Sequence, residues 1–188
     1  KQKVLILGTT GRTGASILNG LLKDPESFLD IEALVRPSSV ERLEVKNLAA
    51  KGVEIRVVDI DGPLDELVKA MTGIDVFISA IDAMGQRAEL QLVAAASQAG
   101  VKRFVPCTFI TVAPPGGVFQ LRDTKEEVYR EIWKQYVPYT IIDVAFSNAA
   151  GRPSRLRLHQ IKVKIHAFRQ EFVGELLEGK VEPYRSYH

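Results

Sequence analysis

The chain has 188 residues, of which 46% are hydrophobic and 26% are charged, and its formal net charge is +2. This composition supports one globular domain with a sizeable core, and the charge balance argues against a surface that binds nucleic acid. A single cysteine, Cys107, excludes an internal disulfide, and no apolar run reaches the length of a membrane span. The first apolar stretch is too short for a signal peptide. We therefore expect a cytoplasmic protein, with neither nucleic acid nor membrane as a partner.

The first predicted elements are a buried strand over Lys3–Leu7, a glycine loop over Gly8–Gly14 and a helix over Ala15–Leu22. In such a loop the first glycine permits the tight turn, the second lets the backbone approach a pyrophosphate, and the third lets the helix pack on the sheet. The helix amino terminus then offers N–H groups to the anion. The sequence therefore predicts a dinucleotide site, with a plain glycine-rich turn as the alternative. The loop residues expected to contact the cofactor are Gly8, Thr10, Gly11, Arg12, Thr13 and Gly14.

The second predicted strand, Ile31–Val35, ends at Arg36. A site that prefers NAD usually places an acidic residue there to bind the ribose hydroxyl. A guanidinium instead suits a 2′-phosphate, and the following residues up to Ser39 carry no negative charge. The sequence therefore favours NADP(H) as the cofactor, with Arg36 and Ser39 in contact with it. A solvated surface arginine is the alternative.

The rest of the chain alternates helices with strands, which predicts βαβ units and a doubly wound parallel α/β sheet. Leu43, Leu48 and Ala49 are expected to be the apolar positions of the next helix. The further helices are predicted over residues 40–51, 63–71, 85–98 and 122–135, and the further strands over residues 54–58, 75–79, 103–106 and 138–144.

Ligands of such sheets bind at the carboxyl ends of the strands. This rule selects the loops Gly8–Gly14, Arg36–Ser39, Asp59–Asp61, Ser79–Gln86 and Pro106–Thr111. The small side chains of Ser79 and Ala80 would allow a dinucleotide to pass closely. Gln86 could reach the same cleft, although a glutamine at a helix start is usually solvated. The cofactor-contacting residues expected from the last two of these loops are Ser79, Ala80, Ile81, Gln86, Pro106, Cys107, Thr108 and Phe109.

Five segments in this order resemble the NmrA-like and isoflavone-reductase-like family of atypical short-chain dehydrogenases, and the overlap is closest to fungal aromatic-alcohol-reductase-like members. They cover about the first three quarters of the chain. The segments are V-L-I-L-G-T-T-G-R-T-G at the start, D-V-F-I-S-A at Asp75–Ala80, A-G-V-K-R-F-V-P at Ala99–Pro106, T-K-E-E-V-Y-R-E-I at Thr124–Ile132 and V-P-Y-T-I-I at Val137–Ile142.

The resemblance implies a Rossmann domain that binds NADP, followed by a smaller substrate domain. It also implies hydride transfer from NADPH to a small aromatic, phenylpropanoid-like substrate, with Lys125 at the position of the family's functional lysine. The family's loop after the fifth strand usually reads P-S-E-F, whereas this chain has Pro106–Phe109 without an acid. That difference puts a carboxylate role in this loop in doubt. Without the resemblance, Lys125 reads as part of a solvated helix face.

Other chemistries have weaker support. The Tyr-x-x-x-Lys signature of classical short-chain dehydrogenases is absent, and Cys107 is more easily explained as a small buried residue than as a nucleophile. The histidines have no metal-ligand spacing, so no metal is expected. An NADP-sensing regulator that performs no chemistry is the main functional alternative, and a structural α/β protein with an empty cleft is a third. A homodimer or a regulatory protein partner remains open.

The βα pattern ends near Ala145, so we expect the NADP-binding domain at residues 1–146 and a remnant of the substrate domain, or a tail, at 147–188. Two explanations of the short second part are open. The protein could be reduced, with a pocket that is open or completed by a partner. Alternatively, internal segments could be missing from the sequence, with Phe146–Leu158 as the join, which is the preferred reading. A basic cluster over Arg152–Lys164 could contact an anion but is more simply solvated.

Overall fold

The computed structural model describes residues 2–23, 29–81, 85, 88–109, 114–118 and 120–142. The chain divides into two units, Lys1–Phe146 and Ser147–His188, and every described residue belongs to the first. The predicted remnant at 147–188, the proposed join at Phe146–Leu158 and the basic cluster all lie outside the described residues. The expected division of function between the two parts therefore stays a prediction.

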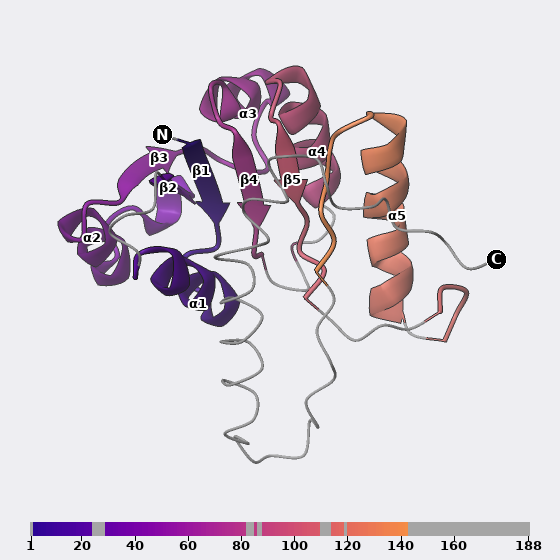
Figure 1. Ribbon diagram of the computed structural model, residues 1–188, viewed down its shortest axis with the longest axis horizontal. Helices are drawn as coiled ribbons and strands as arrows, with labels where there is room; N and C mark the ends of the chain where they lie inside the picture. The colour runs from indigo at the N-terminus through magenta and orange to yellow at the C-terminus, as the bar shows by residue number, and fades with distance from the viewer. Residues whose placement is uncertain are drawn as a thin grey trace, which may run out of the picture. The chain divides into compact units, whose positions relative to one another are not determined.

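Five parallel strands form the sheet of the described part, in the order β3-β2-β1-β4-β5 (Figure 1). The order runs outward from β1 in one direction and then, after β3, continues on the other side of β1 with β4. This reversal is the hallmark of a doubly wound Rossmann-like sheet, and it confirms the predicted fold class. The strands are β1 Gln2–Leu7, β2 Leu29–Val35, β3 Glu54–Val57, β4 Val76–Ser79 and β5 Arg103–Val105.

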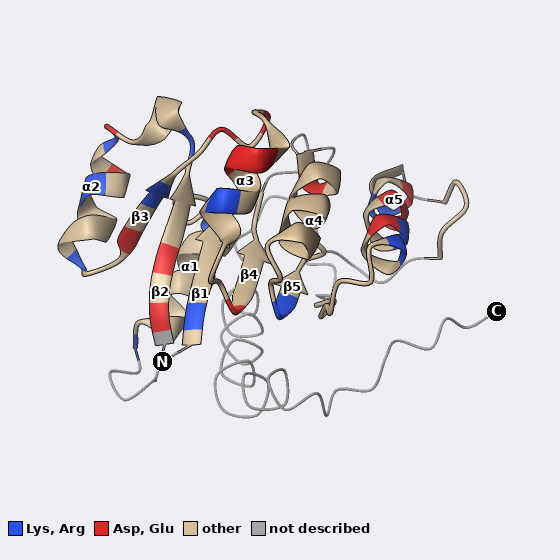
Figure 2. Ribbon diagram, turned by 90° about the horizontal axis from the view of Figure 1, so that it is seen from above, with Lys and Arg blue, Asp and Glu red and all other residues tan. Residues whose placement is uncertain are grey.

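Helices cover both faces of this sheet. Because parallel crossovers are right-handed, the reversal of strand order places α1 and α2 on one face and the later helices on the other (Figures 1 and 2). A short 3-10 turn, η1, precedes α2. The helices are α1 Arg12–Leu21, η1 Pro37–Ser39, α2 Leu43–Ala50, α3 Leu64–Met71, α4 Ala88–Gln98 and α5 Gln120–Lys134.

The hydrophobic core lies between the central strands and the helices α3, α4 and α5. Its centre is an aromatic pair, Phe77 on β4 and Phe104 on β5, with ring centroids 5.4 Å apart. Leu67 and Leu92 reach this core from α3 and α4 and are fully buried. Each such side chain contributes about 1.5–3 kcal/mol by its removal from water. The packing fixes the carboxyl ends of β1 and β4 side by side, where the site described below is found.

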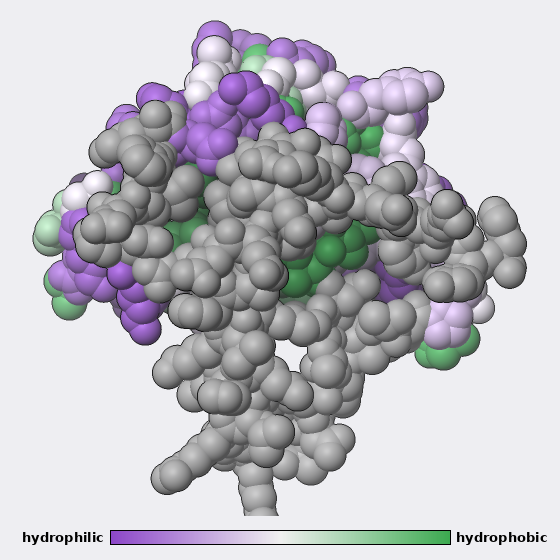
Figure 3. Space-filling model, viewed as in Figure 1, coloured by the Kyte–Doolittle hydropathy of each residue, from purple (hydrophilic) through white to green (hydrophobic). Residues whose placement is uncertain are grey.

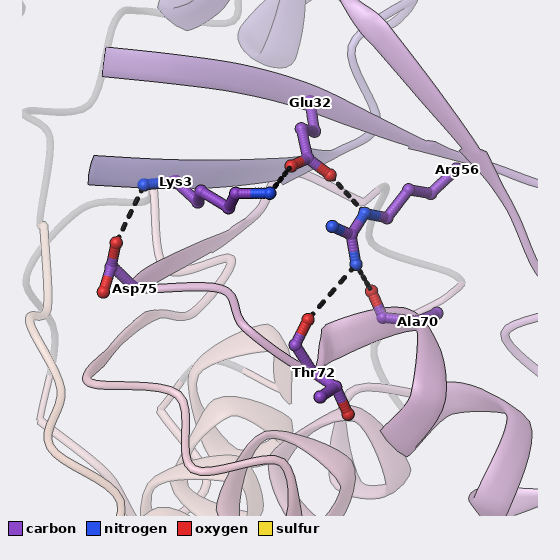
Figure 4. A network of polar contacts seen from close by, with 6 residues as sticks. All are labelled: Lys3, Glu32, Arg56, Ala70, Thr72 and Asp75. Atoms are coloured by element: carbon purple, nitrogen blue, oxygen red, sulfur yellow. Dashed lines mark hydrogen bonds and ion pairs between the residues drawn. The ribbon is translucent and has the colours of Figure 1, made fainter. Parts of the chain in front are cut away.

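A buried carboxylate ties the sheet to α3, toward the amino ends of the strands (Figure 4). Glu32 on β2 is only 1% exposed and forms ion pairs with Arg56 on β3 and with Lys3 on β1. Arg56 also donates from Nη1 to the carbonyl of Ala70, in the last turn of α3, at 2.8 Å. The Lys3 amide donates to Asp75, just before β4, at 2.9 Å. These contacts join β1, β2, β3 and α3 around charged groups that would otherwise be costly to bury.

Two details of the fold differ from the sequence-based prediction. In α2, Leu43 is 70% exposed and Ala49 is exposed, whereas Val45 and Leu48 are buried. Residues three apart share a helix face, and Val45 and Leu48 form the buried face of α2, which begins at Leu43 and not at Val40. The prediction for Leu48 is confirmed, and those for Leu43 and Ala49 are wrong.

The predicted sixth strand over residues 138–144 is reduced, in its described part, to one parallel bridge between Tyr139 and Phe104. The Phe104 amide donates to Pro138, and the Thr140 amide donates to Phe104. Pro138 has no N–H of its own with which to extend the ladder. Residues from 143 onward lie outside the described part. No helix among the described residues is both long and apolar enough to span a membrane.

Candidate functional site

The glycine loop joins β1 to α1 in a turn that leaves no room for side chains at two positions. Gly8 has φ of +86°, and a Cβ there would lie 2.4 Å from the carbonyl oxygen of Ala80 at the end of β4. A Cβ on Gly14 would lie 2.1 Å from the Gly8 oxygen. The Gly11 amide donates to that same oxygen at 2.9 Å. The loop therefore folds onto the junction of β1 and β4, where the strand order reverses.

A cavity of about 340 Å³ opens at this junction, at the carboxyl ends of β1, β2 and β4. Such a switch point is the usual ligand site of a doubly wound sheet. The cavity is bordered by both the amino terminus of α1 and the segment that follows β2. Its lining residues are Leu7, Gly8, Thr9, Thr10, Gly11, Arg12, Thr13, Leu34, Val35, Arg36, Ser39, Arg42, Val45, Ile60, Ala80, Ile81 and Gly85.

Nine of the residues expected from the sequence to contact a cofactor line this cavity. They are Gly8, Thr10, Gly11, Arg12, Thr13, Arg36, Ser39, Ala80 and Ile81. Others lie nearby but do not line it. Gly14 packs beneath the loop, Ser79 is fully buried, and Pro106, Cys107, Thr108 and Phe109 form a separate turn. Gln86 lies outside the described residues. Thr9, Ile60 and Gly85 also line the cavity and fall within the loops selected from the sequence, whereas Arg42 and Val45 were not expected there.

Three guanidinium groups border the cavity, from Arg12, Arg36 and Arg42, and no acidic residue is among its described lining. Arg36 and Arg42 are brought together by two consecutive turns, in which the Ser39 amide donates to the Arg36 carbonyl and the Arg42 amide donates to the Ser39 carbonyl. Hydrophilic residues are frequent on the α2 side of this face of the molecule, with some hydrophobic residues among them (Figure 3). This end of the cavity is therefore suited to a multiply charged anion.

The turn Pro106–Phe109 after β5 forms a second cluster, connected to the cavity through Ile81. The Thr108 amide donates to the Pro106 carbonyl at 2.8 Å, which closes the turn. The Cys107 thiol is 9% exposed and donates to the carbonyl of Ile81, a cavity-lining residue, at 2.9 Å. Cys107 is thus the small buried residue at a strand end that the sequence favoured over a nucleophile.

Two buried charged side chains converge on Cys107. Lys125 on α5 is 1% exposed and donates from Nζ to the Cys107 carbonyl, so the alternative of a solvated helix face is wrong for this residue. Glu89 on α4 is also 1% exposed and accepts a hydrogen bond from the Cys107 amide at 2.6 Å. Burial raises the pKa of the Glu89 carboxyl, against the opposing effects of the Cys107 amide, the Ser79 hydroxyl and the Lys125 charge.

Glu89 was not identified from the sequence. An acidic residue in the first turn of a helix ordinarily reads as a solvated partner of the helix dipole. Only its burial and its hydrogen bond from the Cys107 amide show otherwise. Arg42 was missed because it falls inside a predicted helix, whereas it is the residue that caps α2. Within the described ranges, no group of three or more His, Cys, Asp or Glu side chains could hold a metal ion.

The model of the NmrA-like family matches residues 1–162. The chain is 41% identical to asnovolin J 5′,6′-dehydrogenase of Aspergillus novofumigatus over 143 residues, which cover 76% of this chain and 44% of that protein. It is 31% identical to a phenylcoumaran benzylic ether reductase of Betula pendula over 157 residues, covering 78% and 49% respectively. The chain thus spans about half the length of the curated relatives it matches.

A solved structure resembles the fold as well. The binary complex of leucoanthocyanidin reductase with NADPH, from Vitis vinifera, superposes with a TM-score of 0.67 at 25% identity. The similarity covers 76% of this chain and 49% of that one. Because the family model matches residues 1–162, which is most of the sequence, the chain belongs to the NmrA-like family.

Proposed function

We propose that the chain binds NADP(H) in the cavity at the β1–β4 junction and serves a reductase that transfers hydride from NADPH to a small aromatic or phenylpropanoid-like substrate. The proposal rests on one observation: a tightly packed glycine loop lines the same cavity as Arg36, Ser39 and Arg42. The first element suits a pyrophosphate and the second suits a 2′-phosphate.

The cofactor preference rests on charge. At the end of β2, an NAD site would present a carboxylate to the ribose hydroxyls, which would repel a 2′-phosphate. The described lining of this cavity instead has guanidiniums at that end, from Arg36 and Arg42. Thr10 and Thr13 would add hydroxyl donors near the helix amino terminus. The NADPH complex of the similar leucoanthocyanidin reductase supports the same assignment.

NADPH, when bound, supplies the hydride. The chain must then stabilise the negative charge that develops on the substrate oxygen or conjugated acceptor. We assign this role to Lys125, whose ammonium group is shielded from solvent next to the turn Pro106–Phe109. In low-dielectric surroundings a hydrogen bond from a cation is considerably stronger than in water. The same amine could deliver a proton to the oxyanion.

The substrate class is taken from relatives. The similar proteins include a phenylcoumaran benzylic ether reductase and a dehydrogenase of asnovolin J, which differ in the compounds they are named for. Both align with about half of their own length, so the residues that choose the substrate would lie largely beyond the matched part. We therefore propose the class of reaction and an aromatic type of substrate, without a single compound.

One observation favours a second candidate, an NADP-sensing regulator without chemistry. Lys125 donates to the Cys107 carbonyl and does not line the cavity. A lysine that stays in this position would stabilise the turn instead of a reacting oxygen. In that case the cavity would bind the dinucleotide and the protein would transmit the bound state to a partner.

Turnover separates the two candidates. NADPH oxidation should be followed with a panel of aromatic aldehydes and conjugated phenylpropenes, comparing wild type with Lys125→Met. The matched control is Lys134→Met, which removes an exposed charge from the same helix. For the reductase we expect kcat to fall by about 100-fold or more in Lys125→Met, since acid–base and oxyanion contributions are of that order. NADPH binding without turnover on any member of the panel would favour the regulator.

A further inference from the structure

We propose that Glu89 is the positioning residue for Lys125: its carboxylate holds the backbone of Cys107 from α4 while Lys125 holds the same residue from α5. This inference rests on the function proposed for Lys125. It adds an acidic partner to a turn whose own residues, Pro106–Phe109, include no carboxylate.

The backbone of Cys107 is bound by a charged side chain at both its amide and its carbonyl. Glu89 accepts from the Cys107 amide at 2.6 Å, and Lys125 donates to the Cys107 carbonyl. The two charged residues come from adjacent helices, α4 and α5, which pack against each other. Cys107 therefore links the positions of the two side chains. A shift of the Glu89 carboxylate would move the Cys107 carbonyl, which orients the Lys125 amine.

Burial strengthens the hydrogen bonds that Glu89 and Lys125 form with Cys107. Both side chains are 1% exposed. A buried ammonium without a nearby negative charge is strongly disfavoured, so it tends to lose its proton. Desolvation is the largest effect on the Glu89 carboxyl and raises its pKa, while the Lys125 charge acts in the opposite direction. By reciprocity, the Glu89 carboxylate favours the protonated form of Lys125, the form that can donate to an oxyanion.

The other charged groups around Lys125 have different partners. On α5, Glu126 forms an ion pair with Arg122 at 2.5 Å, and Arg122 also lies 4.9 Å from the ring centre of Tyr129. From the turn, the Cys107 thiol donates to the Ile81 carbonyl. From α4, Glu89 is the carboxylate directed at the turn itself. Among these groups, Glu89 is therefore the one that binds the same residue as Lys125.

The test measures the Lys125 side chain directly, apart from turnover. The full 188-residue chain is labelled with ¹³C at lysine Cε, and the Lys125 signal is assigned by its loss in Lys125→Met. The midpoint pH of its titration is compared in wild type, Glu89→Gln and Glu89→Asp. Gln keeps the shape and can still accept from the Cys107 amide, whereas Asp keeps the charge on a shorter side chain. Glu127→Gln, which removes an exposed acid from α5, is the matched control.

We expect the midpoint to fall by about one pH unit in Glu89→Gln and to change much less in Glu89→Asp and in the control. NADPH affinity should stay within about twofold in all three, because Glu89 does not line the cavity. Where turnover is present, the alkaline limb of its pH profile should shift to lower pH in Glu89→Gln. A purely structural role would lower the melting temperature without moving either pH dependence.

Two results would overturn the inference. One is an unchanged Lys125 midpoint in a folded Glu89→Gln protein. The other, which serves if Glu89→Gln does not fold, is a midpoint in Glu89→Asp that falls well below the wild-type value although the charge is kept. Absence of turnover in wild type, together with a shifted midpoint in Glu89→Gln, would instead contradict the proposed reductase while supporting the coupling of Glu89 to Lys125.

Discussion

Substitution of Gly14 by alanine tests the packing that builds the cofactor cavity, because two effects predict opposite signs. Gly14 is the third residue of α1 and its φ lies in the ordinary helical range. By helix propensity alone, alanine should stabilise the protein by up to about 1 kcal/mol. The contact predicts the reverse, since the new Cβ would lie 2.1 Å from the oxygen and 2.6 Å from the carbonyl carbon of Gly8.

The loss of stability in Gly14→Ala depends on how far the backbone of Gly8 can shift to make room for the new Cβ. A Cβ needs at least about 1 Å more separation from that oxygen than the structure allows. The obstacle is backbone, and Gly8 is itself packed against the Ala80 carbonyl, so neither side can retreat freely. Overpacking of this kind costs about 1–3 kcal/mol, and the backbone obstacle places it toward the upper end. We expect a net loss of about 2 kcal/mol, or about 4–8 °C in melting temperature for a chain of this size.

The assay is urea unfolding followed by circular dichroism, combined with NADPH titration. Asn19→Ala, an exposed position in the same helix, is the control, and it should stabilise slightly through propensity. NADPH affinity should fall at least about tenfold in Gly14→Ala, because the amides of the loop are displaced from the phosphates. A Gly14→Ala protein as stable as Asn19→Ala and with unchanged NADPH affinity would refute the reasoning.

Three further outcomes are expected. Glu32→Gln should lower the free energy of unfolding by about 2 kcal/mol, because Arg56 keeps its backbone contact but loses a buried carboxylate; equal urea midpoints for variant and wild type would contradict this. Arg42→Ala should weaken NADPH more than NADH in calorimetric titration, and an equal effect on both would count against a 2′-phosphate contact. The hydrogen bond from Lys102 lowers the pKa of Asp75, so Asp75 stabilises the fold above its unfolded pKa near 4 and loses this effect as the pH falls through its lower folded value. The stability difference between wild type and Asp75→Asn should therefore be largest at neutral pH and shrink in acid, and a constant difference from pH 7 to pH 2 would show that the ion pair is irrelevant.

The sequence predicted the sheet well because its strands are nearly continuous apolar runs. Val4–Leu7 and Val76–Ser79 are buried on both faces, as is usual in parallel sheets. Short apolar runs of this kind, bounded by turns that contain glycine, are readily recognised as strands. The sixth strand was over-predicted for the same reason. Its residues are apolar and β-branched, yet the described part forms only the bridge at Tyr139. Apolar content indicates burial, but it does not determine how many ladder bonds are made.

Residues of the candidate site that belong to a local sequence motif were predicted. Residues that reach the site only through tertiary packing were missed. Gly8 and Gly14 follow from spacing, because the turn and the close contact are local. Arg42 was missed because its place depends on the start of α2, and helix starts are set by competing caps. Glu89 depends on the contact between α4 and the turn at Cys107, which sequence periodicity does not report. Lys125 was selected by family resemblance, although its neighbours alone suggested a solvated face, and its catalytic role stays a prediction.

We propose that the cavity at the β1–β4 junction binds NADP(H) through the glycine loop and the arginines after β2. Isothermal titration of the chain with NADPH and with NADH, at one salt concentration, tests it most directly. We expect NADPH to bind at least about tenfold more tightly, since the 2′-phosphate gains charge-assisted hydrogen bonds from Arg36 and Arg42. Equal affinities, or no binding of either dinucleotide, would contradict the account.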